Sequence, residues 1–138
     1  MDNPHFPDSS ERPSKSFEFR AVLLVDDDKQ LATTIQWILA DQQFMVDVAN
    51  DGAEALQKVK ANEYDVIVCD VMMPKLRGDE VYLEATAVRP ELADRFIFIT
   101  GYAADPKINV FLTKTSCKYL IKPFPVQTLI DSIRQLLA

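Results

Sequence analysis

The chain has 138 residues, enough for one domain with a sizeable core and too few for two domains of ordinary size. Acidic residues outnumber basic ones by 21 to 15, and the resulting net charge of -6 argues against nucleic acid or an anionic membrane as the main partner. No apolar run approaches the roughly 18 residues that a membrane-spanning helix needs. We therefore expect no membrane span.

The N-terminal segment and the cysteines indicate where the protein works. Residues 1–19 are rich in proline, serine and charge without a helical or strand period, which predicts a flexible tail or linker. The tail holds the only histidine, His5, and lacks the basic start and apolar stretch of a secretory signal. Cys69 and Cys117 lie in apolar strand-like runs, which predicts buried free thiols and a reducing, cytoplasmic location.

From residue 20 onward, short apolar segments alternate with amphipathic ones. The strand-like segments are residues 21–25, 45–49, 66–70, 96–100 and 117–121. The helical segments are residues 29–41, 51–62, 78–88, 105–115 and 125–137. This alternation predicts one α/β domain over residues 20–138, a doubly wound five-stranded parallel sheet with helices on both faces. Neither GxGxxG nor GxxxxGK[ST] is present, so we expect no dinucleotide or ATP site.

Two of the predicted helices begin with capping signals. Asp28 precedes the first helix, and Asn50 or Asp51 precedes the second. Short polar side chains at these positions accept hydrogen bonds from the backbone N–H groups of the first turn. Within the second helix, we expect Ala53 to face the core.

Asp70 ends the apolar run of residues 66–69 and is followed by Val71-Met72-Met73-Pro74. A buried parallel strand that ends in this way delivers its last side chain to the carboxyl edge of the sheet, where ligands bind in open α/β folds. Taken alone, such an aspartate is more often a helix cap. Its role therefore depends on what the other strands bring to the same edge.

Polar residues also follow the first, fourth and fifth strands. They are Asp26-Asp27-Asp28, Thr100-Gly101 and Lys122-Pro123. An acidic cluster could be a solvated helix cap, but several acids with a lysine at one edge are harder to explain in that way. Crowded carboxylates need a cation, and hard oxygen ligands select Mg²⁺ or a similar ion. We therefore predict a magnesium site formed by Asp26, Asp27 and Asp70.

This group of residues has the chemistry of phosphoryl transfer. A carboxylate can act as the nucleophile, and a divalent metal shields its charge from the incoming phosphate. Lys122 would form an ion pair with one phosphoryl oxygen, and the Thr100 hydroxyl would donate a hydrogen bond to another. The pattern therefore predicts that Asp70 accepts a phosphoryl group.

Residues 20–138 resemble a response regulator receiver domain of two-component signalling. The resemblance is carried, in this order and at the usual spacing of that family, by Leu24-Val25-Asp26-Asp27-Asp28, Tyr64-Asp65-Val66-Ile67-Val68-Cys69-Asp70, Met73-Pro74 with Gly78, Ile99-Thr100-Gly101, and Tyr119 before Lys122-Pro123-Phe124. Each piece is a weak signal alone, whereas all of them together are specific. The implied fold is a flavodoxin-like (βα)5 domain with strand order 2-1-3-4-5.

The resemblance also implies roles for individual residues. Asp70 would take its phosphoryl group from a phosphohistidine of a histidine kinase or phosphotransfer protein, and the backbone carbonyl of Met72 would join the Mg²⁺ ligands. Thr100 and Tyr119 would form a coupled switch, although Tyr119 could also be simply a half-exposed strand aromatic. The Lys122–Pro123 peptide would be cis, which costs little before proline.

Partner surfaces follow from the same resemblance. Phosphorylation would alter the face made by the fourth helix, fifth strand and fifth helix, where an unknown downstream protein would bind; a second copy of the chain is a further candidate partner. Direct nucleic-acid binding is not expected. The domain would catalyse only its own phosphorylation and dephosphorylation, so we do not expect an enzyme in the usual sense.

Met72 departs from the polar residue that some receivers carry two positions after the acceptor. An apolar side chain cannot orient an attacking water, which predicts slow loss of the phosphoryl group, and Tyr102 could shield the other side. This departure concerns the lifetime of the phosphorylated form and leaves the acceptor chemistry unchanged.

Several alternatives stay open. No output segment follows the last helix before the chain ends at Ala138, so the domain could stand alone or be the C-terminal receiver of a hybrid histidine kinase or larger regulator. A haloacid-dehalogenase-like phosphatase also uses Asp and Mg²⁺, but its Asp-x-Asp-x-Thr/Val run fails here at Gln30. A degenerate receiver is disfavoured because no site position is missing.

Overall fold

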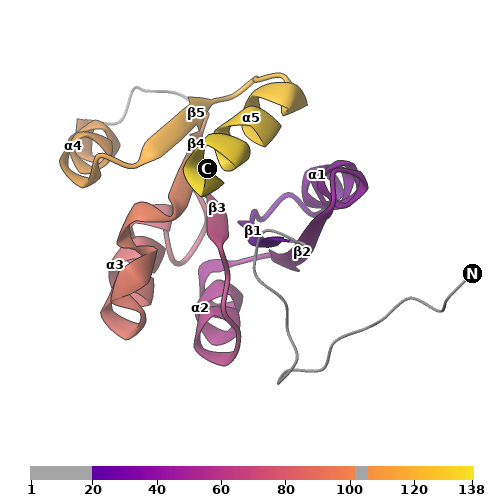
Figure 1. Cartoon of the computed structure of the whole chain (residues 1–138). Helices are drawn as coiled ribbons and strands as arrows, with labels where there is room; N and C mark the ends of the chain where they lie inside the picture. The colour runs from indigo at the N-terminus through magenta and orange to yellow at the C-terminus, as the bar shows by residue number, and fades with distance from the viewer. Residues whose placement is uncertain (1–19, 102–105) are drawn as a thin grey trace, which may run out of the picture.

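The computed structural model describes residues 20–101 and 106–138, which form alternating strands and helices (Figure 1). The strands are β1 (Arg20–Val25), β2 (Phe44–Ala49), β3 (Val66–Asp70), β4 (Phe96–Thr100) and β5 (Lys118–Ile121). The helices are α1 (Lys29–Asp41), α2 (Gly52–Ala61), α3 (Gly78–Val88), the 3-10 helix η1 (Pro90–Asp94), α4 (Pro106–Thr115) and α5 (Val126–Leu137). None of these helices is long and apolar enough to cross a membrane.

The five strands form one parallel sheet in the order β2-β1-β3-β4-β5. The predicted (βα)5 doubly wound fold and its strand order are therefore confirmed. Every residue of β3 and of β4 is buried, which fits strands that carry helices over both faces. The polar residues that end these strands consequently lie at the carboxyl edge of the sheet's interior.

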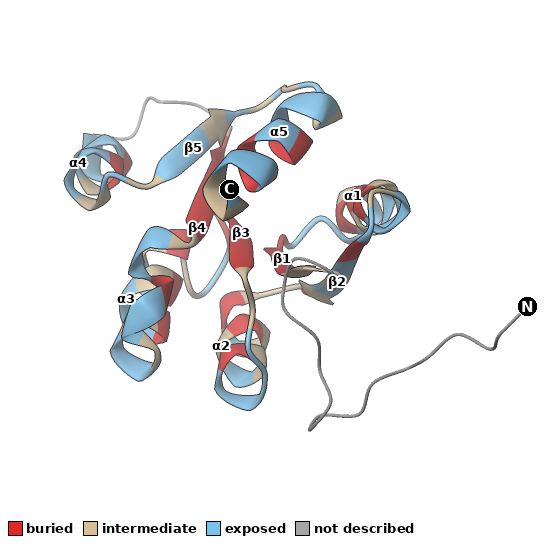
Figure 2. Cartoon of the chain, viewed as in Figure 1, coloured by how far each residue is buried: buried red, intermediate tan, exposed pale blue. Residues whose placement is uncertain are grey.

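Two separate cores lie on the two faces of the sheet (Figure 2). One core packs α1 and α5 against the sheet through aliphatic side chains, which include Ile35, Leu39 and Ile133. The other packs α2, α3 and α4 against the opposite face. Because alternate residues of a strand point to opposite faces, β1 contributes Leu24 to the first core and Leu23 to the second.

An aromatic cluster fixes α3 and α4 to β4. Tyr82 of α3 makes an edge contact with Phe96 at 5.0 Å between ring centroids, and Phe111 of α4 makes an edge contact with Phe98 at 5.2 Å. The Tyr82 hydroxyl donates a hydrogen bond to the carbonyl oxygen of Ala93. Edge-to-face packing of this kind adds to the gain from burial alone.

The fifth strand differs from the prediction. β5 begins at Lys118, one residue later than expected, and Cys117 is only half-buried, so the prediction of a buried thiol there is wrong. The physical reason is that β5 is an edge strand, so much of its side-chain surface stays exposed. Cys69, in the central β3, is a buried free thiol as predicted.

The predicted helix caps are confirmed, the helix bounds agree to within one residue, and one residue predicted to face the core does not. Asp28 caps α1 by accepting a hydrogen bond from the amide of Leu31, and Asp51 caps α2. Ala53 is exposed, contrary to the prediction, and the neighbouring Ala55 faces the core instead. The predicted tail, with His5, lies outside the described residues.

Truncation of Phe98 to alanine tests the importance of the second core. Phe98 is fully buried between α3 and α4, so its removal should lower the free energy of unfolding by about 3–5 kcal/mol. Urea denaturation followed by circular dichroism measures this change. Leu83→Ala, at an exposed site on α3, is the matched control and should change stability by less than about 0.5 kcal/mol. Equal losses in both variants would contradict this account of the core.

Candidate functional site

The candidate site lies where four parallel strands end at the same edge of the sheet. Asp26 follows β1, Asp70 ends β3, Thr100 ends β4 and Lys122 follows β5. Backbone hydrogen bonds continue the ladder past the strand ends, because the amide of Val71 donates to Ile99 and the amide of Lys122 donates to Thr100. The loops that carry the site residues are therefore anchored to the sheet.

Three carboxylates converge at this edge. Each of Asp26, Asp27 and Asp70 contributes one oxygen, and these oxygens all lie within 4.8 Å of one another. Asp26 and Asp70 are buried, whereas Asp27 is exposed. Mg²⁺ prefers a small number of carboxylates together with water, and this oxygen set fits that preference. The three residues predicted to bind a metal are thus brought together.

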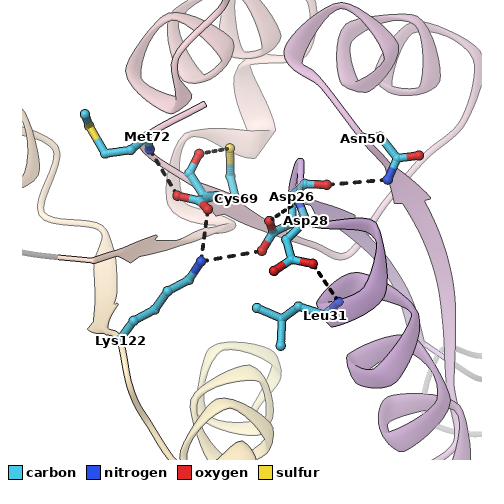
Figure 3. A network of polar contacts seen from close by, with 8 residues as sticks. Asp26, Asp28, Leu31, Asn50, Cys69, Met72 and Lys122 are labelled. Carbon is cyan, nitrogen blue, oxygen red and sulfur yellow. Dashed lines mark hydrogen bonds and ion pairs between the residues drawn. The ribbon is translucent and has the colours of Figure 1, made fainter. Parts of the chain in front are cut away.

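Lys122 lies opposite the two buried carboxylates (Figure 3). Its Nζ is 3.1 Å from Asp70 Oδ2 and 3.8 Å from Asp26 Oδ2. The closer contact is also a hydrogen bond. One ammonium group thereby offsets part of the repulsion among three acids.

Backbone amides orient the same two carboxylates. The amide of Met72 donates to Asp70 Oδ1 at 3.0 Å, and the amide of Asp28 donates to Asp26 Oδ1 at 2.9 Å. In both residues, one oxygen is held by the backbone and the other faces Lys122 (Figure 3). This arrangement fixes the direction in which each carboxylate points.

Burial raises the pKa of Asp70 above its usual value, and the Lys122 ammonium only partly counters that effect. The pKa of Asp26 is raised in the same way by burial, against the hydrogen bond from the Asp28 amide and the charge of Lys122. For Lys122, burial acts to lower the pKa, but the neighbouring Asp70 and Asp26 carboxylates outweigh it and the pKa is raised. Lys122 therefore only partly offsets the cost of burying the two charged carboxylates.

Gly78 allows α3 to begin directly against the end of β3. A Cβ atom at this position would lie 2.6 Å from the Asp70 carbonyl oxygen and 2.8 Å from the Cα of Val71. The Gly78 amide donates to the carbonyl oxygen of Val71, which closes the turn. The sequence identified Gly78 as part of a motif, but only the packing shows that any larger residue would displace the backbone of Asp70.

The two predicted switch residues have different environments. Thr100 is completely buried at the end of β4, next to the site strands. Tyr119 lies on the edge strand β5, opposite Phe98 in register, and is 47% exposed. Their placement at strand positions is as expected, while their coupling stays a prediction. Tyr102 lies outside the described residues.

Two further residues contact the site without having been predicted to do so. The Cys69 thiol donates to the carbonyl oxygen of Asp70, and burial raises the pKa of that thiol, so it is a neutral core group. The Asn50 side-chain amide donates to the carbonyl oxygen of Asp26 at 3.5 Å (Figure 3). Asn50 follows β2, so the rule that polar residues at strand ends meet at one edge could have identified it.

Known proteins share both this sequence pattern and this fold. The family described as the response regulator receiver domain matches residues 22–134. Response regulator MprA of Mycobacterium leprae is 34% identical over 116 residues, which cover 84% of this chain and 50% of that protein. Response regulator ArlR of Staphylococcus epidermidis is 29% identical over the same length, covering 84% of this chain and 52% of the relative. The chain thus spans about half the length of these relatives.

A solved structure gives the same result for the fold. The CheY-like receiver domain protein from Methanospirillum hungatei superposes with a TM-score of 0.79 at 26% identity, covering 87% of this chain and 94% of the other. The chain belongs to the response regulator receiver domain family of two-component systems. Receiver domains are signalling modules that interact with histidine kinases or phosphotransfer proteins and bind Mg²⁺ at an acidic pocket.

The raised pKa values predict how stability depends on pH. Asp70 and Asp26 hold protons more tightly in the folded than in the unfolded chain, whose Asp pKa is about 3.9. Their contribution to stability is therefore full below that value and is lost as pH rises through the folded pKa values. In EDTA at pH 7, Asp70→Asn should raise the free energy of unfolding by about 1 kcal/mol.

The same difference should shrink as the pH is lowered toward 4, because the wild-type carboxyl then becomes neutral as well. Urea titrations at several pH values measure it, and Asp131→Asn, at an exposed position on α5, is the control. A mutant less stable than wild type at pH 7 would mean that the Lys122 ion pair outweighs the cost of burying the charged Asp70 carboxylate.

Proposed function

We propose that Asp70 is the phosphoryl acceptor of this receiver domain. The observation that carries the proposal is the contact of Lys122 with Asp70 at 3.1 Å, beside two further acids. An oxygen of the Asp70 carboxylate attacks the phosphorus of a phosphohistidine on a histidine kinase or phosphotransfer protein. The P–N bond breaks, its electron pair leaves with the imidazole, and an acyl phosphate remains on Asp70.

Mg²⁺ is the cofactor that this oxygen set favours. Asp26, Asp27 and Asp70 would hold it, with the backbone carbonyl of Met72 as a further ligand. When bound, the ion would neutralise part of the negative charge that the carboxylates present to the phosphoryl group. The raised pKa values of Asp26 and Asp70 support this role, because burial has removed these carboxylates from water and Lys122 only partly stabilises their charged forms.

Lys122 and Thr100 are the residues that would respond to the new charge. Lys122 already contacts Asp70, so its ammonium can form an ion pair with an oxygen of the phosphoryl group that Asp70 receives. Thr100 ends β4 at the same edge, and its hydroxyl would donate a hydrogen bond to another oxygen. Movement of Thr100 toward the site would open space for Tyr119, which connects the site to the partner face.

The partner face would be formed by α4, β5 and α5. It exposes apolar side chains on the edge strand, Tyr119 and Ile121, and Val110 on α4. Surfaces of this composition favour protein partners. The downstream partner, and any output domain in a longer parent such as a hybrid histidine kinase, would read the state of Asp70 through this face.

The phosphatase alternative is disfavoured by the geometry after β1. That class would need both acids of the run Asp26-x-Asp28 to serve the reaction. Asp28 instead accepts the hydrogen bond that caps α1. Hydrolysis of a phosphate monoester that survived Asp70→Asn would nevertheless support a phosphatase.

Treatment with a small phosphodonor such as acetyl phosphate tests the assignment of Asp70. With Mg²⁺, intact-mass spectrometry should show one added phosphoryl group on the wild-type protein and none on Asp70→Asn. EDTA should abolish the gain in the wild type. Asp131→Asn, a matched change on the exposed face of α5, should be phosphorylated normally. A mass gain that persists in Asp70→Asn would refute the assignment.

The lifetime of the acyl phosphate should depend on Met72. This side chain is 52% exposed beside the acceptor and offers no hydrogen bond strong enough to orient water. We expect phosphorylated wild type to persist for minutes or longer at neutral pH with Mg²⁺, and Met72→Asn to lose phosphate at least severalfold faster. Mass spectra taken after removal of the donor measure both rates. Loss within seconds in the wild type would contradict the prediction.

A further inference from the structure

The outer face of α1 carries the most exposed large apolar side chain of the described residues. Trp37 is 75% exposed, although it lies in the middle of a well-formed helix. The buried residues of α1 face the sheet, and the side of the helix that faces away from the sheet is exposed (Figure 2). A tryptophan exposed to this extent loses most of the gain that burial would bring, so this face lacks a partner in the monomer.

The residues around Trp37 make this face more apolar than their names suggest. The hydroxyl of Thr33 donates to the carbonyl oxygen of Lys29, and that of Thr34 donates to Gln30. Because both hydroxyls bond within the helix, these threonines present mainly their methyl groups, and Ala40 adds another one turn along. We call Thr33, Thr34, Trp37 and Ala40 the α1 patch.

The charges of α1 are confined to its two ends. Lys29 is its first residue and Asp41 its last, and the eleven positions between them carry no charged side chain. Both end residues are exposed. In a chain of net charge -6, most surfaces would repel a second copy, whereas this face has an uncharged centre with opposite charges at its ends.

We propose that the α1 patch is the surface through which two copies of this chain form a dimer. A twofold axis through the patch would place the two α1 helices antiparallel, with Trp37 of each copy packed on the patch of the other. The same symmetry would bring Lys29 of each copy toward Asp41 of the other, which gives two equivalent ion pairs. Antiparallel packing also aligns the two helix dipoles favourably.

The size of the patch sets the strength of this dimer. A stable interface buries about 1,200–2,000 Å² in total, more than the outer faces of two single helices supply. We therefore expect a weak dimer with a dissociation constant in about the micromolar range or above. In such a small interface, one aromatic residue at the centre carries most of the affinity.

The dimer leaves α4 and β5 of the proposed partner face accessible. α1 packs beside β2 at one edge of the sheet, whereas β5 forms the opposite edge and α4 lies on the other face. α5 packs on the same face as α1, and Arg134 of α5 donates a hydrogen bond to the side chain of Gln42 just after α1. Dimerisation through the outer side of α1 can therefore coexist with a downstream partner on α4 and β5. It does not depend on phosphorylation of Asp70, so the two proposals can fail separately.

Trp37 is the only tryptophan, so its fluorescence reports directly on this surface. As the protein concentration rises from about 1 µM through the expected range, the emission should shift to shorter wavelength as the side chain becomes buried. Sedimentation equilibrium over the same concentrations should give a monomer–dimer equilibrium with the same dissociation constant. An emission spectrum that stays constant while dimers form would place the dimer elsewhere and overturn the proposal.

Substitutions separate the contribution of Trp37 at the centre of the interface from that of the charged residues at its ends. Trp37→Ala should weaken the dimer by about thirtyfold or more, and the exposed Leu83→Ala on α3 should not change it. Asp41→Lys should weaken it about tenfold, because it sets two lysines against each other. Lys29→Glu combined with Asp41→Lys restores opposite charges at both ends and should restore the affinity.

The two charge variants also exclude misfolding as the reason for a loss of dimer affinity. A lysine in the last turn and a glutamate in the first turn both suit the helix dipole, so both variants should fold. Failure of the double variant to recover affinity would refute the antiparallel arrangement. A protein that stays monomeric at every concentration would refute the dimer itself, whatever the outcome at Asp70.

Discussion

Repulsion among carboxylates at the end of a parallel sheet is the constraint on which this domain depends. Asp26 and Asp70 are buried with their oxygens close together, and burial raises the pKa of each. Lys122 supplies one positive charge from the far strand, and backbone amides hold the remaining oxygens. The folded chain thereby keeps a site that is costly without a cation and well suited to receive one.

The surrounding structure holds that site against the repulsion. Two cores clamp β3 and β4 between helices, so the strand ends cannot separate to relieve the charge. Gly78 brings the start of α3 against the backbone of Asp70, which restrains the end of β3. The edge strand β5 pairs with β4 alone and is more exposed than β3 and β4. Lys122, which follows β5, is the residue that links this exposed edge to the buried carboxylates.

Much of the candidate site could be predicted from the sequence because parallel strands end at one edge. Strand-ending residues such as Asp70 and Thr100 must then be neighbours, whatever the details of packing. The sequence was less informative about which side chains of a helix or of an edge strand are buried. Ala53 and Ala55 differ little in a helical pattern, and Cys117 lies in an apolar run that turns out to flank an exposed edge strand. Burial at such positions depends on neighbours that are remote in the chain.

The sequence by itself determined the alternation of strands and helices, the cap at Asp28, and the identity of the polar residues that follow each strand. These features depend on local periodicity and on the chemistry of single side chains. Only the tertiary structure decided that Lys122 reaches both buried acids, that Gly78 must lack a side chain, and that Trp37 is left uncovered on α1. Those facts are distances between elements, and they exist only once the sheet and its helices have packed together.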